Sequence, residues 1–136
     1  MTVELIDPIQ LVTEILEQNG YDQVHSELLT SDAMSAECYI WLTEQPGSTP
    51  HVHYSNRPAI GVTVYSKSGY GASRRHSYDI QALLADSISV KYPSGGIHSM
   101  ITDIHPYRQD IAGTPFGVGR TYAQYSLILS DFSHWS

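Results

Sequence analysis

The pattern of apolar and polar positions first becomes regular after Asp7 and Pro8. Apolar residues recur there at helical spacing, with Glu and Gln on the opposite side. These apolar positions are Ile9, Val12, Ile15 and Leu16. Asp is a favoured N-cap and Pro is favoured at the first helical position, so this pair predicts a helix start. Asn19 and Gly20 predict its end, because Gly readily takes the left-handed conformation that closes helices.

Four later segments have the composition or alternation of β-strands: residues 37–43, 59–66, 97–105 and 120–130. In the second segment the alternation places Ile60, Val62 and Val64 on one face. Gly61 lies on its other face and predicts a close approach by another backbone, since Gly otherwise weakens a strand. In the last segment one face consists of Thr121, Ala123, Tyr125, Leu127 and Leu129.

A second helical pattern lies between the strand pairs. Its apolar stripe consists of Ile80, Leu83, Leu84 and Ile88. We expect a loop over residues 67–71 to lead into this helix and Ser73 to cap its start, because Ser is a favoured N-cap. The turn-forming residues 93–96 (PSGG) predict its end.

The remaining segments predict loops. Residues 21–35 contain apolar side chains that fit no period, which predicts a loop or a short turn. Residues 44–58 contain three prolines and form a connection longer than most, and such loops are often functional. Residues 106–116 form a polar loop between the last two strands.

The resulting order is helix, strand, strand, helix, strand, strand. This order predicts an α+β fold with a mainly antiparallel sheet and two helices packed on one face. The 136 residues suit a single domain, residues 1–136, with one hydrophobic core.

The composition of the chain restricts the classes of function that are compatible with it. The formal net charge is −7, which excludes a protein that binds nucleic acid through a basic surface, although DNA could slide past an acidic wall. Only 15% of residues are charged, whereas ten are Tyr. Tyr suits protein contacts because it combines apolar area with a polar tip, although Tyr also favours strands for packing alone.

The single cysteine, Cys38, excludes a disulfide within the chain and a zinc site built on several cysteines. Its apolar neighbours indicate a buried small hydrophobic residue. No signal peptide and no apolar run of about 20 residues is visible. We therefore expect a soluble protein made in the cytoplasm, with no membrane partner.

His51 and His53 form the pattern most typical of a metal site, because residues two apart in a strand point to the same side. Residues 54–60 contain no acidic residue that would complete a cupin-type ligand set. The alternative is a pair of loop histidines that form local hydrogen bonds. On balance we expect no bound metal or other cofactor.

Nucleophile and phosphate motifs are incomplete. Gly69 and Gly71 precede the second helix, where Ser73, Arg74 and Arg75 could hold a phosphate. Salt bridges from the arginines to an acidic neighbour are the favoured alternative. We therefore predict that the protein is not an enzyme, and we name Tyr70, Arg74 and Arg75 as candidate interface residues.

The order of elements resembles the tail terminator proteins of long-tailed double-stranded DNA bacteriophages, which include the minor tail protein U group. These proteins are small, single-domain, α+β and usually acidic. The resemblance covers most of the chain and lies in the pattern of three segments, residues 57–65, 72–90 and 120–129. The loop at 44–58 departs from it. Head-completion proteins of the phage neck share the fold and much of the pattern.

The resemblance implies a structural virion protein without catalytic activity. Copies of the chain would form a ring, typically a hexamer, that caps the tail tube and joins the head connector, with DNA only passing through the lumen. Its location would be the head–tail junction of the virion. The alternatives are a head-completion or neck protein, a small metal-binding protein that uses His51 and His53, and an interaction domain with no phage connection.

Overall fold

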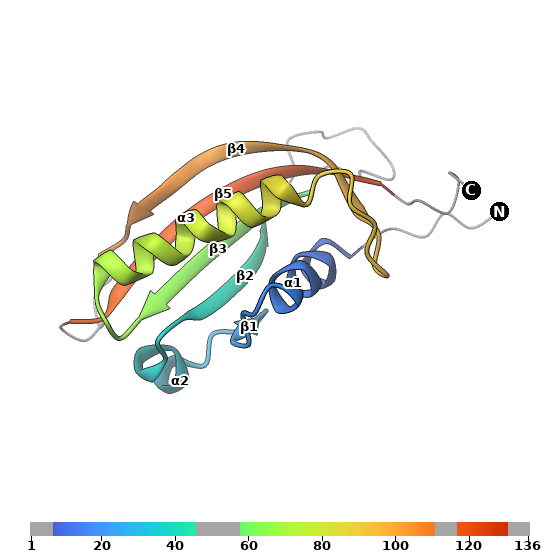
Figure 1. Ribbon diagram of the computed structural model, residues 1–136. Coiled ribbons are helices and arrows are strands. Elements are labelled where there is room, and N and C mark those ends of the chain that lie inside the picture. The colour runs from blue at the N-terminus through green and yellow to red at the C-terminus, as the bar shows by residue number, and fades with distance from the viewer. Residues whose placement is uncertain (1–6, 46–57, 111–116, 131–136) are drawn as a thin grey trace.

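The computed structural model describes residues 7–45, 58–110 and 117–130. Their elements, shown in Figure 1, are α1 (Pro8–Gln18), β1 (Val24–His25), α2 (Thr30–Ser35), β2 (Tyr39–Gln45), β3 (Ala59–Ser66), α3 (Tyr70–Asp86), β4 (Gly96–Arg108) and β5 (Gly119–Ser130). The predicted α+β class is confirmed, and the two predicted helices and four predicted strands are all present.

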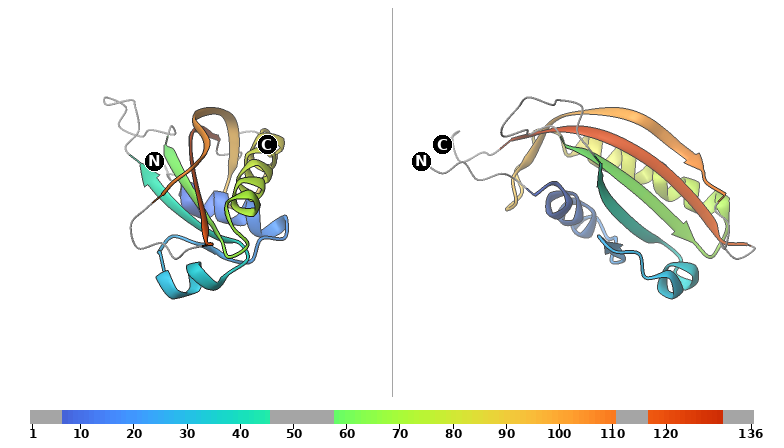
Figure 2. Two further views of the ribbon diagram at one scale, coloured as in Figure 1. Left: turned by 90° about the vertical axis from the view of Figure 1, so that its left-hand side faces the viewer. Right: turned by 180° about the vertical axis from the view of Figure 1, so that it is seen from behind.

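The strands form one sheet in the order β1-β2-β3-β5-β4. All neighbouring strands pair antiparallel except β1 and β2, which pair parallel. The central strand β3 therefore lies between β2 and β5, and β4 forms one edge. Both α1 and α3 cover the same face of the sheet, and the view from behind shows the strands in front of α3 (Figure 2).

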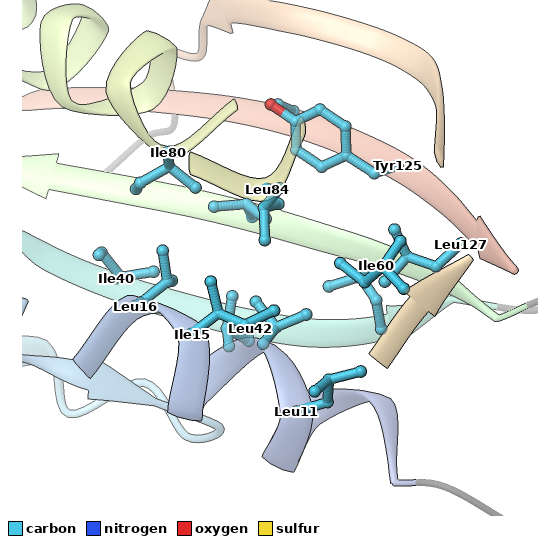
Figure 3. Packing of buried hydrophobic residues seen from close by; sticks show 14 of the residues in the cluster. Leu11, Ile15, Leu16, Ile40, Leu42, Ile60, Ile80, Leu84, Tyr125 and Leu127 are labelled. Carbon is cyan, nitrogen blue, oxygen red and sulfur yellow. The ribbon is translucent and has the colours of Figure 1, made fainter. Parts of the chain in front are cut away.

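The main hydrophobic core lies between this face and the two helices (Figure 3). The helices contribute Leu11, Val12, Ile15, Leu16, Ile80 and Leu84, and the strands contribute Ile40, Leu42, Ile60, Val62, Val64, Ile97, Ala123, Tyr125, Leu127 and Leu129. The predicted apolar face of β5 is completely buried, while the residues between are half-buried. The two periodicities read from the sequence thus place most of the core correctly, although Ile9, Leu83 and Ile88 are only partly buried and Leu11 was not predicted.

The two long helices begin in different ways. As predicted, Asp7 caps α1, because its carboxylate accepts hydrogen bonds from the backbone amides of Ile9 and Gln10. The prediction that Ser73 caps α3 is wrong. The helix begins at Tyr70 after Gly69, whose φ of 101° places it in the left-handed region. Ser73 is instead buried inside the first turn, where its hydroxyl donates to the carbonyl of Val64 at 2.8 Å.

The segment predicted as a loop or short turn, residues 21–35, contains β1 and α2. Its order depends on Tyr39, whose hydroxyl donates to the carbonyl of Glu27 and accepts from the amide of Leu29. Ala33 of α2 packs with Tyr39 and Tyr65 in a second, smaller core. Because these contacts are tertiary, no periodic pattern in the segment could indicate them.

Two strand predictions need correction. A Cβ atom at Gly61 would lie 2.6 Å from the hydroxyl of Thr43 and 2.8 Å from that of Tyr122, so side chains approach Gly61, and not another backbone. The close backbone approach occurs at Gly119, whose Cβ would lie 2.3 Å from the carbonyl carbon of Gly69. In addition, β4 continues to Arg108, through residues predicted to form a loop.

Candidate interaction surface

The edge strand β4 is the most exposed element of the sheet. It pairs with β5 along one side, and its register shifts three times, between Ile97 and Ser99, between Thr102 and Ile104, and between Ile104 and Tyr107. Such shifts mark bulges, which bend a strand and interrupt regular pairing. Pro106 lies in the last irregular stretch, as expected for Pro, which lacks an amide proton and occurs in sheets at edges and bulges.

Three large apolar side chains of β4 face solvent. The exposed fractions of Ile101, Ile104 and Tyr107 are 63%, 37% and 44%. Their partners on β5 are Ser126, Gln124 and Tyr122. These partners alternate along β5 with the residues buried beneath the helices. The three β4 residues therefore lie on the sheet face opposite α1 and α3. We call Ile101, Ile104 and Tyr107 the β4 stripe.

The β4 stripe is joined to neighbouring aromatic residues. The ring of Tyr107 meets that of Tyr122 edge-on, with 6.1 Å between centroids. The Tyr107 hydroxyl accepts a hydrogen bond from the Gln109 side chain. Sequence reasoning missed this stripe because β4 alternates only weakly and its bulges change which residues share a face.

The candidate interface residues at the start of α3 point in different directions. The guanidinium of Arg74 lies 5.4 Å from the ring centre of Tyr78, one turn further along the helix. The same side of α3 presents Gln81, whose amide donates to the hydroxyl of Thr102 on β4. Residues 74, 78 and 81 share one helix face, so Arg74 lies beside β4.

The other two candidates have separate surroundings. Arg75 is exposed. Because successive helical residues are rotated by about 100°, its side chain lies on the side of α3 away from β4. Tyr70 is half-buried beneath the guanidinium of Arg108, which lies 5.3 Å from its ring centre. Thus Tyr70 and Arg74 border β4, whereas Arg75 belongs to another surface.

A row of side chains crosses the face opposite α1 and α3. His25 stacks on Tyr39 with 4.6 Å between ring centroids, and Tyr39 meets Tyr65 edge-on at 6.4 Å. Arg120 lies over Tyr65, hydrogen bonds to its hydroxyl and donates to Gln109 at 2.7 Å. Since Tyr39 and Tyr65 are fully buried, this row fixes α2 and β1 to the sheet and offers little surface to a partner.

A shallow cleft of about 500 Å³ lies between the segment that follows α1 and helix α3. Its lining includes Tyr21, His76 and Asp79. Burial, followed by the negative charge of Asp79 and proximity to Cys38, raises the pKa of Tyr21 to about 12. Burial and the neighbouring carboxylates of Glu37, Asp22 and Asp79 raise the pKa of Cys38 to about 12. The Cys38 thiol is therefore protonated at neutral pH and unsuited to act as a nucleophile.

The candidate metal ligands His51 and His53 lie outside the described residues. Within residues 7–45, 58–110 and 117–130, no three His, Cys, Asp or Glu side chains are grouped so that they could hold a metal ion. In the same part of the chain no helix is long and apolar enough to cross a membrane.

Charge is distributed unevenly along the chain. Residues 1–45 contain nine acidic residues and no Lys or Arg, whereas the rest contains seven Lys or Arg and five acidic residues. In the sheet, β1 and β2 belong to the acidic part, and β3, β4 and β5 belong to the other. Among the described residues, the part with α1, β1 and β2 therefore contains eight acidic residues and no Lys or Arg, whereas the part with β3, α3, β4 and β5 contains six Lys or Arg and four acidic residues.

Comparison with known proteins gives no family assignment. No protein-family model matches the sequence, and no curated protein matches it at a significant level.

Proposed function

We propose that this protein is a structural component of a long-tailed bacteriophage virion, a tail terminator. In this role, copies of the chain form a ring, as a hexamer, that caps the tail tube and joins it to the head connector. DNA passes through the ring without being bound. The protein performs no catalysis, and its function resides in contacts with other copies and with the neighbouring tail proteins.

The observation that carries this proposal is the β4 stripe. Ile101, Ile104 and Tyr107 are exposed on an edge strand, next to the half-buried Tyr122. Exposed apolar side chains gathered along an edge strand favour contact with another protein, because burying them removes apolar area from water. A subunit of a ring needs such a surface on its side.

Two further properties agree with a tail terminator. The chain has the element order that resembles this family, with the long α3 between the strand pairs. Its acidity is concentrated in residues 1–45, which include β1 and β2. If the described residues of this part outside 22–37 border the lumen, their carboxylates, which include Glu14 and Glu17 of α1, repel the phosphates of passing DNA.

The proposal is tested on the purified protein and on virions. Light scattering after size exclusion and negative-stain electron microscopy should reveal a closed ring with a central opening. Gold-labelled antibodies against the protein should mark the head-proximal end of isolated tails from the phage whose genome encodes it. Labelling of tail-free heads would instead indicate a head-completion protein, and absence of label from both particles would refute a virion role.

A further inference from the structure

The two edges of the sheet present surfaces of opposite character. One is formed by residues 22–37, which contain β1 and α2, and we call it the β1 flank. The other, the β4 flank, consists of the β4 stripe with Arg74 and Tyr78 of α3. Because β1 and β4 are the outermost strands, these flanks lie at opposite edges of the sheet (Figure 1).

The β1 flank is acidic and contains an exposed apolar residue. All four of its acidic residues are exposed, and it contains no Lys or Arg. These residues are Asp22, Glu27, Asp32 and Glu37. Leu29, at the start of α2, has an exposed fraction of 48%. The flank therefore combines negative charge with an apolar contact point.

The β4 flank is apolar, with arginine at its border. Two carboxylates lie near it in the sequence: Asp103 accepts a hydrogen bond from the Ser126 hydroxyl, and Asp110 forms an ion pair with Arg108 at 3.0 Å. Arg74 is exposed and lies over Tyr78, whose exposed fraction is 40%. A cation stacked on an aromatic ring keeps its charge available to an anion on a second protein.

The flanks of one molecule cannot meet each other. Four strand spacings of about 4.8 Å separate β1 from β4, so the two edges lie roughly 19 Å apart. Contact between them therefore requires two molecules. A contact between two different surfaces of identical chains is head-to-tail, and such contacts generate rings when the rotation between neighbours closes.

We propose that copies of this chain associate head-to-tail, with the β4 flank of one copy against the β1 flank of the next. Leu29 then packs on the β4 stripe at the sheet face opposite α3, and Arg74, on the α3 side of the same edge, faces the carboxylates of Glu27 and Asp32. This inference rests on the ring proposed above and identifies the surfaces that build it.

The contact uses side chains and does not extend the sheet. The three register shifts of β4 and Pro106 interrupt the row of backbone groups that a continuous strand would need. On the other flank, β1 has only two residues and offers little backbone for pairing. An irregular edge also prevents unlimited strand addition, which suits an assembly with a fixed number of subunits.

Reciprocal charge changes test the pairing of the flanks. Variant A combines Arg74→Glu with Ile101→Glu on the β4 flank, and variant B combines Glu27→Lys with Asp32→Lys on the β1 flank. In each pure variant the contact brings like charges together, so we expect the dissociation constant of self-association to rise about tenfold or more. Sedimentation velocity measures this over a range of concentrations.

Mixing the two variants gives the decisive result. The two carboxylates introduced on the β4 flank of A then meet the two ammonium groups introduced on the β1 flank of B, while the native β4 flank of B meets the native β1 flank of A. An equimolar mixture should recover self-association, in assemblies where A and B alternate. A control with Glu17→Lys and Asp86→Lys, two exposed positions outside both flanks, should associate like the wild type. Circular dichroism verifies that all variants fold.

The outcomes separate this inference from the proposed function. If the wild type forms rings and A and B do so equally well, the flank pairing is wrong while the ring remains. If A and B each lose association but the mixture does not recover it, the flanks contact other surfaces, and the pairing is again wrong. Monomers for every sample refute both the pairing and the preformed ring, whereas the location on virions is decided by gold labelling alone.

Discussion

Strands β3 and β4 belong to the same sheet but differ in burial and in the regularity of their pairing. All eight residues of β3 are buried, and its pairing with β2 and β5 has no register shift. Strand β4 has thirteen residues and pairs with β5 on one side, with a bridge from Ile97 to Ile88 on the other. It shifts register three times and leaves the β4 stripe exposed. A central strand covered on both faces has one possible register, whereas an edge strand tolerates irregularity.

The two strands therefore differ in their contribution to the hydrophobic core. Ile60, Val62 and Val64 of β3 are buried beneath α1 and α3, and the opposite face packs Tyr65 beside Ala33 of α2. In β4, Ile97 is fully buried and Met100 packs partly against the core, while the following stretch lies outside it. We infer that β3 determines stability and that β4 supplies a surface for contact. If this division holds, substitutions in and around β3 should cost far more stability than the same substitutions at exposed sites.

Ile60→Ala should have the largest effect. Ile60 is 1% exposed, so the change removes buried apolar volume and leaves a cavity between the sheet and the helices. Removal of a fully buried Ile side chain costs about 2–5 kcal/mol in the free energy of unfolding. Urea denaturation followed by circular dichroism measures the loss.

The matched control is Ile104→Ala on β4, where the same atoms are removed from an exposed site. We expect its free energy of unfolding to change by no more than about 0.5 kcal/mol. Similar losses for the two variants would contradict the division between the strands.

Gly61→Ala should destabilise the protein by a smaller amount. The new Cβ would lie 2.6 Å from the hydroxyl of Thr43 and 2.8 Å from that of Tyr122, so side chains on both neighbouring strands must move. Overpacking of this kind costs about 1–3 kcal/mol. Thermal and urea unfolding measure it, and adding Thr43→Ala should recover part of the loss.

Gly71→Ala provides the comparison, because nothing lies within 4 Å of a Cβ at that helical position. It should leave stability unchanged or raise it by up to about 1 kcal/mol. An unchanged unfolding midpoint in Gly61→Ala would show that the tight contacts relax freely.

Much of this fold is predictable from the sequence because its main elements are periodic. The bounds of β3 agree with the alternation of residues 59–66, and α1 begins where Asp7 and Pro8 indicate. The segment with β1 and α2 was not predicted, because its order depends on the Tyr39 hydroxyl and on packing against Tyr65. Contacts between residues distant in sequence have no local signature.

The interface role predicted for Tyr70, Arg74 and Arg75 stays a prediction. Tyr70 and Arg74 border β4, whereas Arg75 lies on another side of α3, a difference that follows from the roughly 100° between successive helical residues. The β4 stripe could not be predicted because bulges break the alternation of its side chains. The acidic character of residues 1–45 is plain in the sequence, but its meaning as one side of a sheet emerges only with the strand order.

Ser73→Ala tests the connection between α3 and β3, and its effect should be moderate. The Ser73 hydroxyl is buried, donates to the Val64 carbonyl at 2.8 Å and hydrogen bonds to the Thr121 hydroxyl. Removing it leaves buried polar groups with fewer partners, at a cost of about 1–2 kcal/mol in urea unfolding.

The double variant Ser73→Ala with Thr121→Val should be less destabilised than the sum of the single variants, since it removes both hydroxyls together. Additive losses would mean that the two hydroxyls do not act as a pair. Ser68→Ala, at an exposed site, should change stability by no more than about 0.5 kcal/mol.

Tyr125→Phe should have the smallest effect at neutral pH and a growing effect in alkali. Tyr125 pairs with Ile60 across the sheet and is 1% exposed, and its hydroxyl has no hydrogen-bond partner among the described residues. Removing a buried hydroxyl without a partner should therefore leave stability at pH 7 unchanged or raise it by about 1 kcal/mol.

Burial, with a smaller effect of Tyr78, raises the pKa of Tyr125 above its usual value of 10.0. Above that pH the unfolded chain releases the Tyr125 proton while the folded chain retains it, so the wild type loses stability as pH rises. Tyr125→Phe lacks this loss, and its advantage over the wild type in urea unfolding should increase from about pH 9 to about pH 11. An advantage that does not change with pH would show that the Tyr125 hydroxyl reaches solvent in the folded protein, and that the face of the sheet beneath α3 is less closed than β3 indicates.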